Sequence, residues 1–206
     1  MGEKYKKTKE NYDKGIDWHI QKSLSYSWVT QIDRFVKKLK GNRVLDAGCG
    51  GGRDIKEFIK RGIKVDGIDY SRETIKRCRK VFPQVKFYVG DLRKMNLPNR
   101  EYDGVWACAS ILNLKKKDIP KALSEFKRVL KKGGKLFVSV KGGKGERLIR
   151  DQAGERFFSF FSSGEIKGLL EKSGFKVAYL EIISDAKLKM FDPLKPNWIC
   201  LYAESS

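Results

Sequence analysis

The sequence predicts an α/β fold, in which a doubly wound, mostly parallel sheet carries helices on both faces. Strand-like and helix-like patterns alternate from residue 43 to residue 174, which is typical of such sheets. A glycine-rich turn follows the first strand. The last two strand patterns are separated by a loop too short for a helical crossover, so they should form a hairpin with one strand antiparallel to the rest. The 206 residues are enough for one domain with its own core.

Each expected element rests on the spacing of its apolar residues. Ser71 should cap the helix at residues 72–82, and Ser162 and Glu165 have the spacing of a capping box. The run "KKGG" should end the helix before it in a left-handed cap. The predicted strands cover residues 43–47, 64–69, 85–90, 102–109, 135–141, 175–183 and 197–204, and the predicted helices cover residues 29–39, 53–61, 72–82, 119–130 and 162–174.

The composition indicates a globular chain, since 40% of its residues are hydrophobic and 34% are charged. No apolar run approaches the roughly 20 residues that span a membrane, and the polar first residues lack the apolar core of a signal peptide. We therefore expect a soluble, cytoplasmic protein. Neither a disulfide framework nor a zinc site is expected, because no CxxC pair occurs among the four scattered cysteines, Cys49, Cys78, Cys108 and Cys200.

The net charge of +20 allows two interpretations. A surface that binds RNA or DNA is one of them. A lysine-rich, solvated surface is the other. The lysines are spread along the chain without an RGG tract or a separate basic tail, so nucleic acid is the less favoured partner.

The glycine turn "VLDAGCGGGRD", at residues 44–54, excludes two common ligands. A P-loop needs GxxxxGK[ST], which occurs nowhere in the chain. A dinucleotide fingerprint needs a third glycine where the chain has Arg53. Asp46, two residues before Gly48, would also repel a pyrophosphate in a partly desolvated site.

A cationic ligand such as S-adenosylmethionine fits the same turn. Its sulfonium and α-ammonium groups suit Asp46, and the turn's glycines let the backbone approach the ligand. Arg53, at the start of the next helix, is a candidate partner for the ligand's carboxylate. The pattern is Asp46-x-Gly48-x-Gly50-x-Gly52.

Two further acids end the next two strands. Asp69 lies where an acid can bind ribose hydroxyls, and Tyr70 follows it as a candidate neighbour of adenine. Asp91 is placed to accept from the adenine amino group, with Leu92 against the ring. Each acid alone is a weak signal, because acids often cap helices or form turns. All three in order, at the ends of successive strands, form a strong one.

Together with this turn, the stretches "GIDYS", "VGDLRKMNLP", "EYDGVWACASILNL" and "FKRVLKKGGKLFVSVK" resemble the class I S-adenosylmethionine-dependent methyltransferases, in the branch called type 11 or 25. The resemblance covers roughly residues 40–180. It implies a Rossmann-like, seven-stranded sheet with one antiparallel strand, a cofactor-binding domain over residues 41–206 and a lid formed by residues 1–40. It also places Ala107 beside the cofactor.

The chemistry requires no fixed catalytic residue. Methyl transfer from a sulfonium is an in-line displacement, which depends mainly on positioning, and a base is needed only for a protonated nucleophile. No catalytic residue is therefore assigned, although the single histidine, His19, is a candidate base. Asn113 stands where many relatives have a histidine, and Cys108 is expected to be a packing residue. The [ND]PP[YF] motif of enzymes that methylate amino groups is missing.

The stretch after the fifth strand is expected to be a mobile, glycine-containing loop beside the substrate. Most of its phenylalanines should be core residues, and its basic residues are candidates for attracting an anionic substrate. Tyr12 and Trp18 are candidate lid residues. The glycines are Gly142, Gly143 and Gly145, the phenylalanines are Phe157, Phe158, Phe160 and Phe161, and the basic residues are Lys141, Lys144, Arg147, Arg150 and Arg156.

The favoured function is methyl transfer to a small or medium-sized acceptor. Two alternatives stay open at this stage: a tRNA methyltransferase of the wobble-uridine type, and a non-catalytic protein that binds S-adenosylmethionine. The sequence leaves the acceptor and the oligomeric state undetermined.

Overall fold

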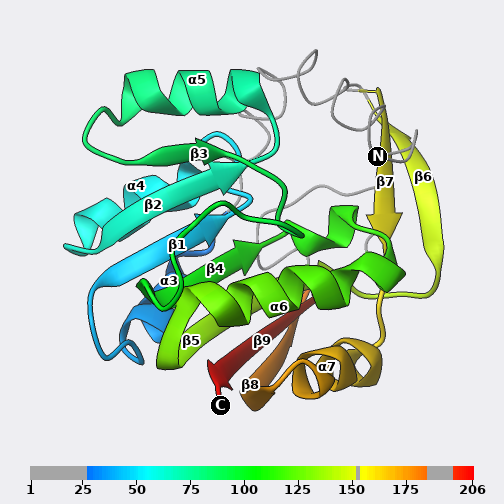
Figure 1. The fold of residues 1–206 in the computed structure, drawn as a ribbon. Helices are drawn as coiled ribbons and strands as arrows, with labels where there is room; N and C mark the ends of the chain where they lie inside the picture. Colours follow the sequence, from blue (N-terminus) through cyan, green and yellow to red (C-terminus); the bar gives the residue numbers. More distant parts are fainter. Residues whose placement is uncertain (1–26, 152–153, 185–196) are drawn as a thin grey trace.

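The computed structural model describes residues 27–151, 154–184 and 197–206. Figure 1 shows their arrangement around one central sheet. The helices are α3 (Val29–Val36), α4 (Arg53–Lys60), α5 (Arg72–Val81), α6 (Ile119–Val129) and α7 (Ser163–Lys172), with short 3-10 turns at Ile111–Asn113 and Lys116–Asp118. The strands are β1 (Arg43–Ala47), β2 (Lys64–Asp69), β3 (Phe87–Val89), β4 (Tyr102–Cys108), β5 (Leu130–Lys141), β6 (Glu146–Asp151), β7 (Gly154–Ser159), β8 (Phe175–Ile183) and β9 (Trp198–Ser205).

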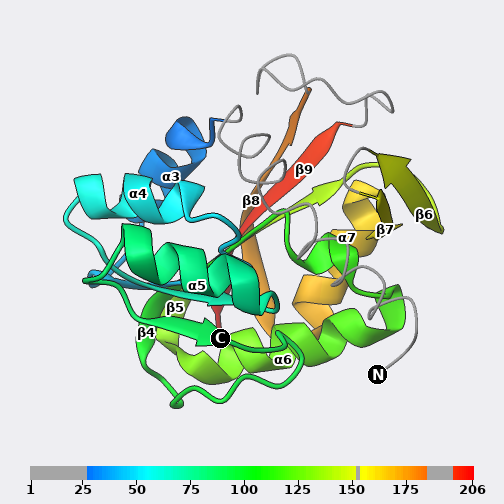
Figure 2. The ribbon, with the colours of Figure 1, turned by 90° about the horizontal axis from the view of Figure 1, so that it is seen from above.

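Seven of these strands form one sheet in the order β3-β2-β1-β4-β5-β9-β8. The pairs from β3 to β5 are parallel, while β9 runs antiparallel to both β5 and β8. Figure 2 shows α3, α4 and α5 on one side of the sheet and α6 on the other, where α7 contacts it. The predicted doubly wound sheet with one antiparallel strand is confirmed.

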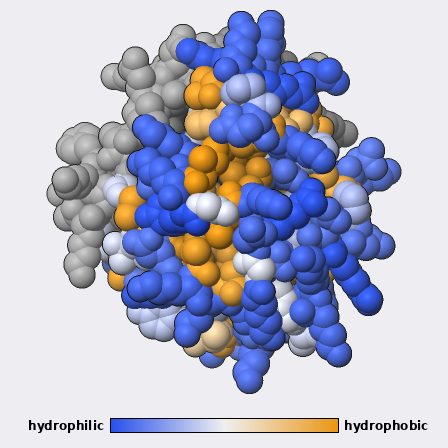
Figure 3. All heavy atoms as spheres, turned by 90° about the vertical axis from the view of Figure 1, so that its left-hand side faces the viewer, coloured by the Kyte–Doolittle hydropathy of each residue, from blue (hydrophilic) through white to orange (hydrophobic). Residues whose placement is uncertain are grey.

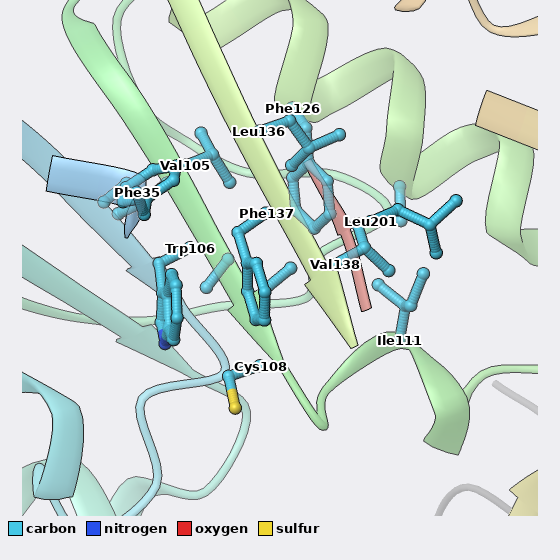
Figure 4. Close-up of a cluster of buried hydrophobic side chains, with 14 of the residues drawn as sticks. Phe35, Val105, Trp106, Cys108, Ile111, Phe126, Leu136, Phe137, Val138 and Leu201 are labelled. Carbon is cyan, nitrogen blue, oxygen red and sulfur yellow. The ribbon is translucent and has the colours of Figure 1, made fainter. Parts of the chain in front are cut away.

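Aromatic stacking anchors the centre of the sheet. Trp106 on β4 and Phe137 on β5 lie face to face, with ring centroids 3.8 Å apart and planes inclined by 11° (Figure 4). Phe35 from α3 packs on Trp106 at 5.3 Å, and Trp28 meets Phe137 edge to face at 6.2 Å. The described part of the predicted lid, residues 27–40, therefore contributes to the same core as the sheet.

The helix ends follow the capping signals in part. The hydroxyl of Ser71 accepts the Thr74 amide at 3.1 Å, so the predicted cap is confirmed. The predicted cap at "KKGG" is wrong, because α6 ends at Val129 and Leu130 already pairs with Tyr102 as the first residue of β5. The helix predicted at residues 29–39 ends at Val36, and the strand predicted at residues 85–90 is only Phe87–Val89.

The mobile loop predicted after β5 is also a wrong prediction, because the chain forms the β6–β7 hairpin there. The amide of Gly143 bonds the carbonyl of Phe161, and the Phe161 amide bonds the carbonyl of Lys141, at 2.9 and 3.0 Å. The backbone is thus tied on both sides of the hairpin. All four phenylalanines of the stretch are buried, as expected for core residues: Phe157, Phe158, Phe160 and Phe161.

Hydrophilic side chains cover most of one face of the molecule (Figure 3). A strip of hydrophobic side chains runs through the middle of that face. Among the described residues no helix is long and apolar enough to cross a membrane.

Candidate cofactor-binding site

The glycine turn lies directly after β1, at the carboxyl end of the parallel strands. The amides of Gly48 and Cys49 both donate to the carbonyl of Ile68 on β2, at 2.8 and 3.1 Å. Gly48 has a φ of +88°, and a Cβ there would lie 2.3 Å from the Cβ of Ser110. Only glycine therefore fits this position, where the exit of β4 presses on the turn.

Asp69 holds the tip of the turn from the end of β2. One carboxylate oxygen accepts the Gly50 amide at 3.0 Å, and the other accepts the Ser71 amide at 2.9 Å. Gly50 has a φ of +48°, and a Cβ placed on it would meet nothing within 4 Å. Asp69 thus fixes the turn from one side. The space where a Cβ of Gly50 would lie is open, so a ligand can approach the backbone there.

Gly52 and Arg53 begin helix α4. Gly52 has a φ of +80°, and a Cβ there would lie 2.6 Å from the ring of Phe82. The guanidinium of Arg53 binds both carboxylate oxygens of Asp54, at 2.6 and 2.7 Å. Although burial disfavours the charged guanidinium, the carboxylate of Asp54 raises the pKa of Arg53 above its ordinary value.

A buried network joins this helix start to β4 and β5. The indole of Trp106 donates to Asp54 at 2.8 Å, and the Arg53 guanidinium lies 3.4 Å from the Cys108 sulfur. The hydroxyl of Ser139 accepts the Ala109 amide at 2.9 Å. Sequence reasoning did not find the roles of Asp54 and Ser139, because their partners lie far away along the chain.

Asp46 is the most unusual group of the site. It is only 2% exposed, and one of its carboxylate oxygens has no hydrogen-bond partner among the described residues. Burial, and then the nearby carboxylate of Asp54, raise the pKa of the Asp46 carboxyl well above its ordinary value. A buried carboxylate without a partner is costly, and a cation placed beside it would relieve that cost. Ser110, whose Oγ is also buried without a partner, lies across the turn.

The remaining predicted cofactor residues lie at the same edge of the sheet. Tyr70 is half-buried directly after β2, and Leu92 is half-buried and packs against the core. Asp91 binds the side chain of Arg93; burial opposes ionisation there, but these hydrogen bonds keep the pKa of Asp91 below its ordinary value. Ala107 is fully buried within β4.

Other candidates have structural partners or lie elsewhere. The Asn113 amide donates to the Phe157 carbonyl at 2.8 Å, so it ties the β4 exit to the hairpin. Cys108 is buried, as expected for a packing residue, and burial raises the pKa of its thiol well above the ordinary value. Tyr12, Trp18 and His19 lie outside the described residues.

The residues therefore fit a compact, cationic ligand that lies against the backbone. Asp46 supplies an unpartnered buried oxygen, and the space above Gly50 is open. Within the described ranges, no group of three histidine, cysteine or acidic side chains is placed to hold a metal ion.

Comparisons with known proteins agree with this geometry. A family described as "Methyltransferase domain" matches residues 44–134. The demethylmenaquinone methyltransferase of Chlorobaculum tepidum is 30% identical over 164 residues, which cover 76% of this chain and 64% of that protein. A probable S-adenosylmethionine-dependent methyltransferase of Mycolicibacterium smegmatis is 31% identical over 145 residues, which cover 70% and 56%. The chain belongs to the class I S-adenosylmethionine-dependent methyltransferases.

A solved structure shows the same class I methyltransferase fold. The 1,6-didemethyltoxoflavin-N1-methyltransferase of Burkholderia thailandensis, with 1,6-didemethyltoxoflavin and S-adenosylhomocysteine bound, superposes with a TM-score of 0.74 at 19% identity. The match covers 96% of this chain and 84% of that one. The chain spans less than two thirds of the length of the two curated methyltransferases named above.

Proposed function

We propose that this chain binds S-adenosylmethionine at the carboxyl end of β1, β2 and β3 and transfers its methyl group to a small or medium-sized acceptor. Asp46 carries the proposal, because one of its carboxylate oxygens is buried without a hydrogen-bond partner among the described residues, and a cationic ligand would supply that partner. The methionine end would lie against Asp46, Gly48, Gly50 and Gly52, with Arg53 toward the carboxylate. Asp69 would bind the ribose, Tyr70, Asp91 and Leu92 would lie at the adenine, and Ala107 would lie beside the cofactor.

The chain's own residues contribute positioning more than proton transfer. The cofactor, when bound, supplies an activated methyl group on a sulfonium. Asp69 and the Ile68 carbonyl fix the turn before any ligand arrives, so little ordering is left for the binding step. Such positioning supplies about 7–11 kcal/mol in well-oriented reactions, which is why a strong general base is not required.

A small acceptor is favoured over RNA by the relatives, whose names refer to demethylmenaquinone and other small molecules. We place the protein in the cytoplasm, because all four cysteines are free thiols and reduced thiols suit that compartment. Transfer of tritium from labelled cofactor into an extract, split into RNA, protein and metabolite fractions, tests the acceptor. Label in the metabolite fraction is expected. Cofactor binding without label in any fraction would favour the non-catalytic alternative.

Calorimetry with S-adenosylhomocysteine and S-adenosylmethionine tests the site itself. Asp46→Asn removes the charge but keeps the shape, and it should weaken binding of both ligands by about 1.5–3 kcal/mol, as expected for a hydrogen bond to a charged group. Asp103→Asn is the matched control, since Asp103 lies at the opposite end of the strands and accepts the Arg43 amide at 3.1 Å. Equal affinity in wild type and Asp46→Asn would contradict the assignment.

A further inference from the structure

Two cysteine side chains meet beside the glycine turn. Cys49 is part of the turn, and Cys78 lies on α5, which packs against β2 and β3 (Figure 1). Both residues are buried, at 6% and 1% exposure. The Cys78 sulfur lies 3.1 Å from the carbonyl oxygen of Gly50, the residue that follows Cys49, and the two thiols are close enough to share a hydrogen bond. The pair therefore links the turn to a helix that lies elsewhere in the sequence.

Two glycines leave room for these sulfur atoms. A Cβ added to Gly67 on β2 would lie 3.0 Å from the Cys49 sulfur, and a Cβ added to Gly52 would lie 3.6 Å from the Cys78 sulfur. The two thiols thus occupy the space between the turn, β2 and α5. Each of these elements is fixed by its own backbone hydrogen bonds, so the pair stays in contact in the folded chain.

One thiol of the pair ionises more readily than the other. The hydrogen bond with Cys49 lowers the pKa of the Cys78 thiol, and the positive charge of Arg77 also lowers it, although burial opposes the change. The same hydrogen bond, and then burial, raise the pKa of Cys49 well above its ordinary value. The thiolate is the nucleophilic form of cysteine. A cysteine that ionises readily beside a second thiol is the arrangement found at sites of reversible oxidation.

We propose that Cys49 and Cys78 are a site of reversible oxidation, at which hydrogen peroxide forms a disulfide that weakens cofactor binding at the turn. The Cys78 thiolate attacks one peroxide oxygen and breaks the O–O bond, which leaves a sulfenic acid on Cys78 and releases hydroxide. The Cys49 thiol then attacks the Cys78 sulfur, so that the S–S bond forms, the S–O bond breaks and water leaves. The proton that Cys78 gave up neutralises the first hydroxide. The two thiols lose two electrons, and peroxide is reduced to water.

The disulfide would disturb the turn, because its sulfur atoms must come much closer together. Disulfide sulfurs are only about 2.0 Å apart, far less than the sulfur atoms of a hydrogen-bonded pair. The Cys49 amide is held by the Ile68 carbonyl at 3.1 Å, and the Gly50 amide is held by Asp69 at 3.0 Å. Movement of Cys49 toward α5 pulls on both contacts, and oxidation removes the thiol that donates to the Gly50 carbonyl. This effect on binding rests on the proposed function, since it requires the cofactor to lie against the same turn.

Peptide mapping by mass spectrometry tests the modification on the full chain and needs no variant. After treatment with hydrogen peroxide, the expected product is a disulfide between Cys49 and Cys78 that dithiothreitol reduces again. Cys108 and Cys200 are internal controls and should stay reduced, because burial raises the pKa of both thiols. A disulfide between other cysteines, a sulfinic acid without any disulfide, or four unchanged thiols would each overturn the proposal.

Calorimetry with S-adenosylhomocysteine measures the effect on binding. The affinity of the wild type should fall by about fivefold or more on oxidation, as is typical of two coupled sites, and dithiothreitol should restore it. Cys78→Ser keeps a hydroxyl donor for the Gly50 carbonyl but cannot form the disulfide, so peroxide should leave its affinity unchanged. Cys200→Ala is the matched control and should lose affinity on oxidation as the wild type does. Unchanged affinity of the oxidised wild type, or an equal loss in Cys78→Ser, would overturn the proposed effect.

The two levels of inference fail in different ways. A protein that binds S-adenosylhomocysteine but forms no disulfide between Cys49 and Cys78 keeps the proposed function and loses the oxidation site. A protein that forms this disulfide but binds S-adenosylhomocysteine in neither state keeps the oxidation site and loses the proposed function.

Discussion

Two acidic side chains beside the glycine turn have different roles. Asp69 shapes it, since both of its oxygens accept backbone amides. Asp46 has one buried oxygen that no described residue binds. The sequence alone predicted a cofactor-binding role for both acids, because they lie at the ends of successive predicted strands. It did not predict that Asp69 holds the Gly50 amide, since this contact depends on how β1 and β2 pair.

The raised pKa of Asp46 predicts that cofactor binding releases protons. Burial favours the neutral carboxyl, whereas a bound cation favours the carboxylate, so binding should become tighter as the pH rises toward and through the raised pKa. Calorimetric titrations in buffers with different ionisation enthalpies measure the protons released. Asp46→Asn should release fewer protons than the wild type, and identical values would show that another group titrates.

The Asp46 carboxyl gives the stability of the protein without cofactor the opposite pH dependence from cofactor binding. Its folded-state pKa lies above the unfolded value, so the folded chain binds the proton more tightly. The stability that this group contributes is present at low pH and is lost as the pH rises from the unfolded pKa to the folded one. Cofactor binding at higher pH offsets that loss.

Gly48 offers a test of close packing in the turn. Gly48→Ala should lower the free energy of unfolding by about 1–3 kcal/mol, because it combines a φ of +88° with a Cβ 2.3 Å from Ser110. Gly62→Ala is the matched control, since Gly62 has a φ of +70° and an added Cβ meets nothing within 4 Å. Chemical denaturation of both variants separates steric clash from backbone strain. Equal losses would mean that Ser110 moves aside freely.

At the scale of elements, local signals predicted starts better than ends. Ser71 and Ser162 both cap helices, as their positions in the sequence indicate. The end of α6 was predicted wrongly because "KKGG" is a local cap signal, while pairing of Leu130 with Tyr102 is a long-range contact that takes precedence. The β6–β7 hairpin was missed for a similar reason. "ERLIRD" and "GERFFS" lack alternation of apolar and polar residues, and their pairing is supported from outside by Asn113.

The two serine caps should differ in strength. Ser71 is buried, and its hydroxyl oxygen accepts both the amide and the hydroxyl of Thr74. Ser162 is exposed and accepts only the Glu165 amide, at 3.2 Å. Ser71→Ala should therefore cost about 1–2 kcal/mol of stability and Ser162→Ala about 0.5–1 kcal/mol. Thermal unfolding of the two variants measures the difference, and a larger loss for Ser162→Ala would refute this ranking.

At the scale of the whole molecule, the alternation of strands and helices determines the topology. Crossovers between parallel strands are right-handed, so few topologies remain once five strands that alternate with helices are recognised. The antiparallel pairing of β8 with β9 followed from their short connection, whereas the insertion of β9 between β5 and β8 was implied by the resemblance to the family. The buried network of Arg53, Asp54 and Trp106 was beyond the reach of the sequence, because its members come together only when the sheet has formed.

The net charge of +20 also acts at this scale, and it should produce RNA binding without RNA methylation. Helix α5 presents one acidic side chain, Glu73, against five exposed basic ones. Binding of this kind depends on counterion release, so affinity for a random RNA should fall by at least tenfold as salt rises from about 50 to 200 mM. Methyl label from the cofactor should stay in small molecules at both salt concentrations, as the proposed function requires. Filter binding and scintillation counting of the same samples measure both quantities. Methyl label that follows RNA into the bound fraction and declines as salt rises would instead make RNA the substrate. The exposed basic residues of α5 would then be part of the RNA-binding surface: Arg72, Lys76, Arg77, Arg79 and Lys80.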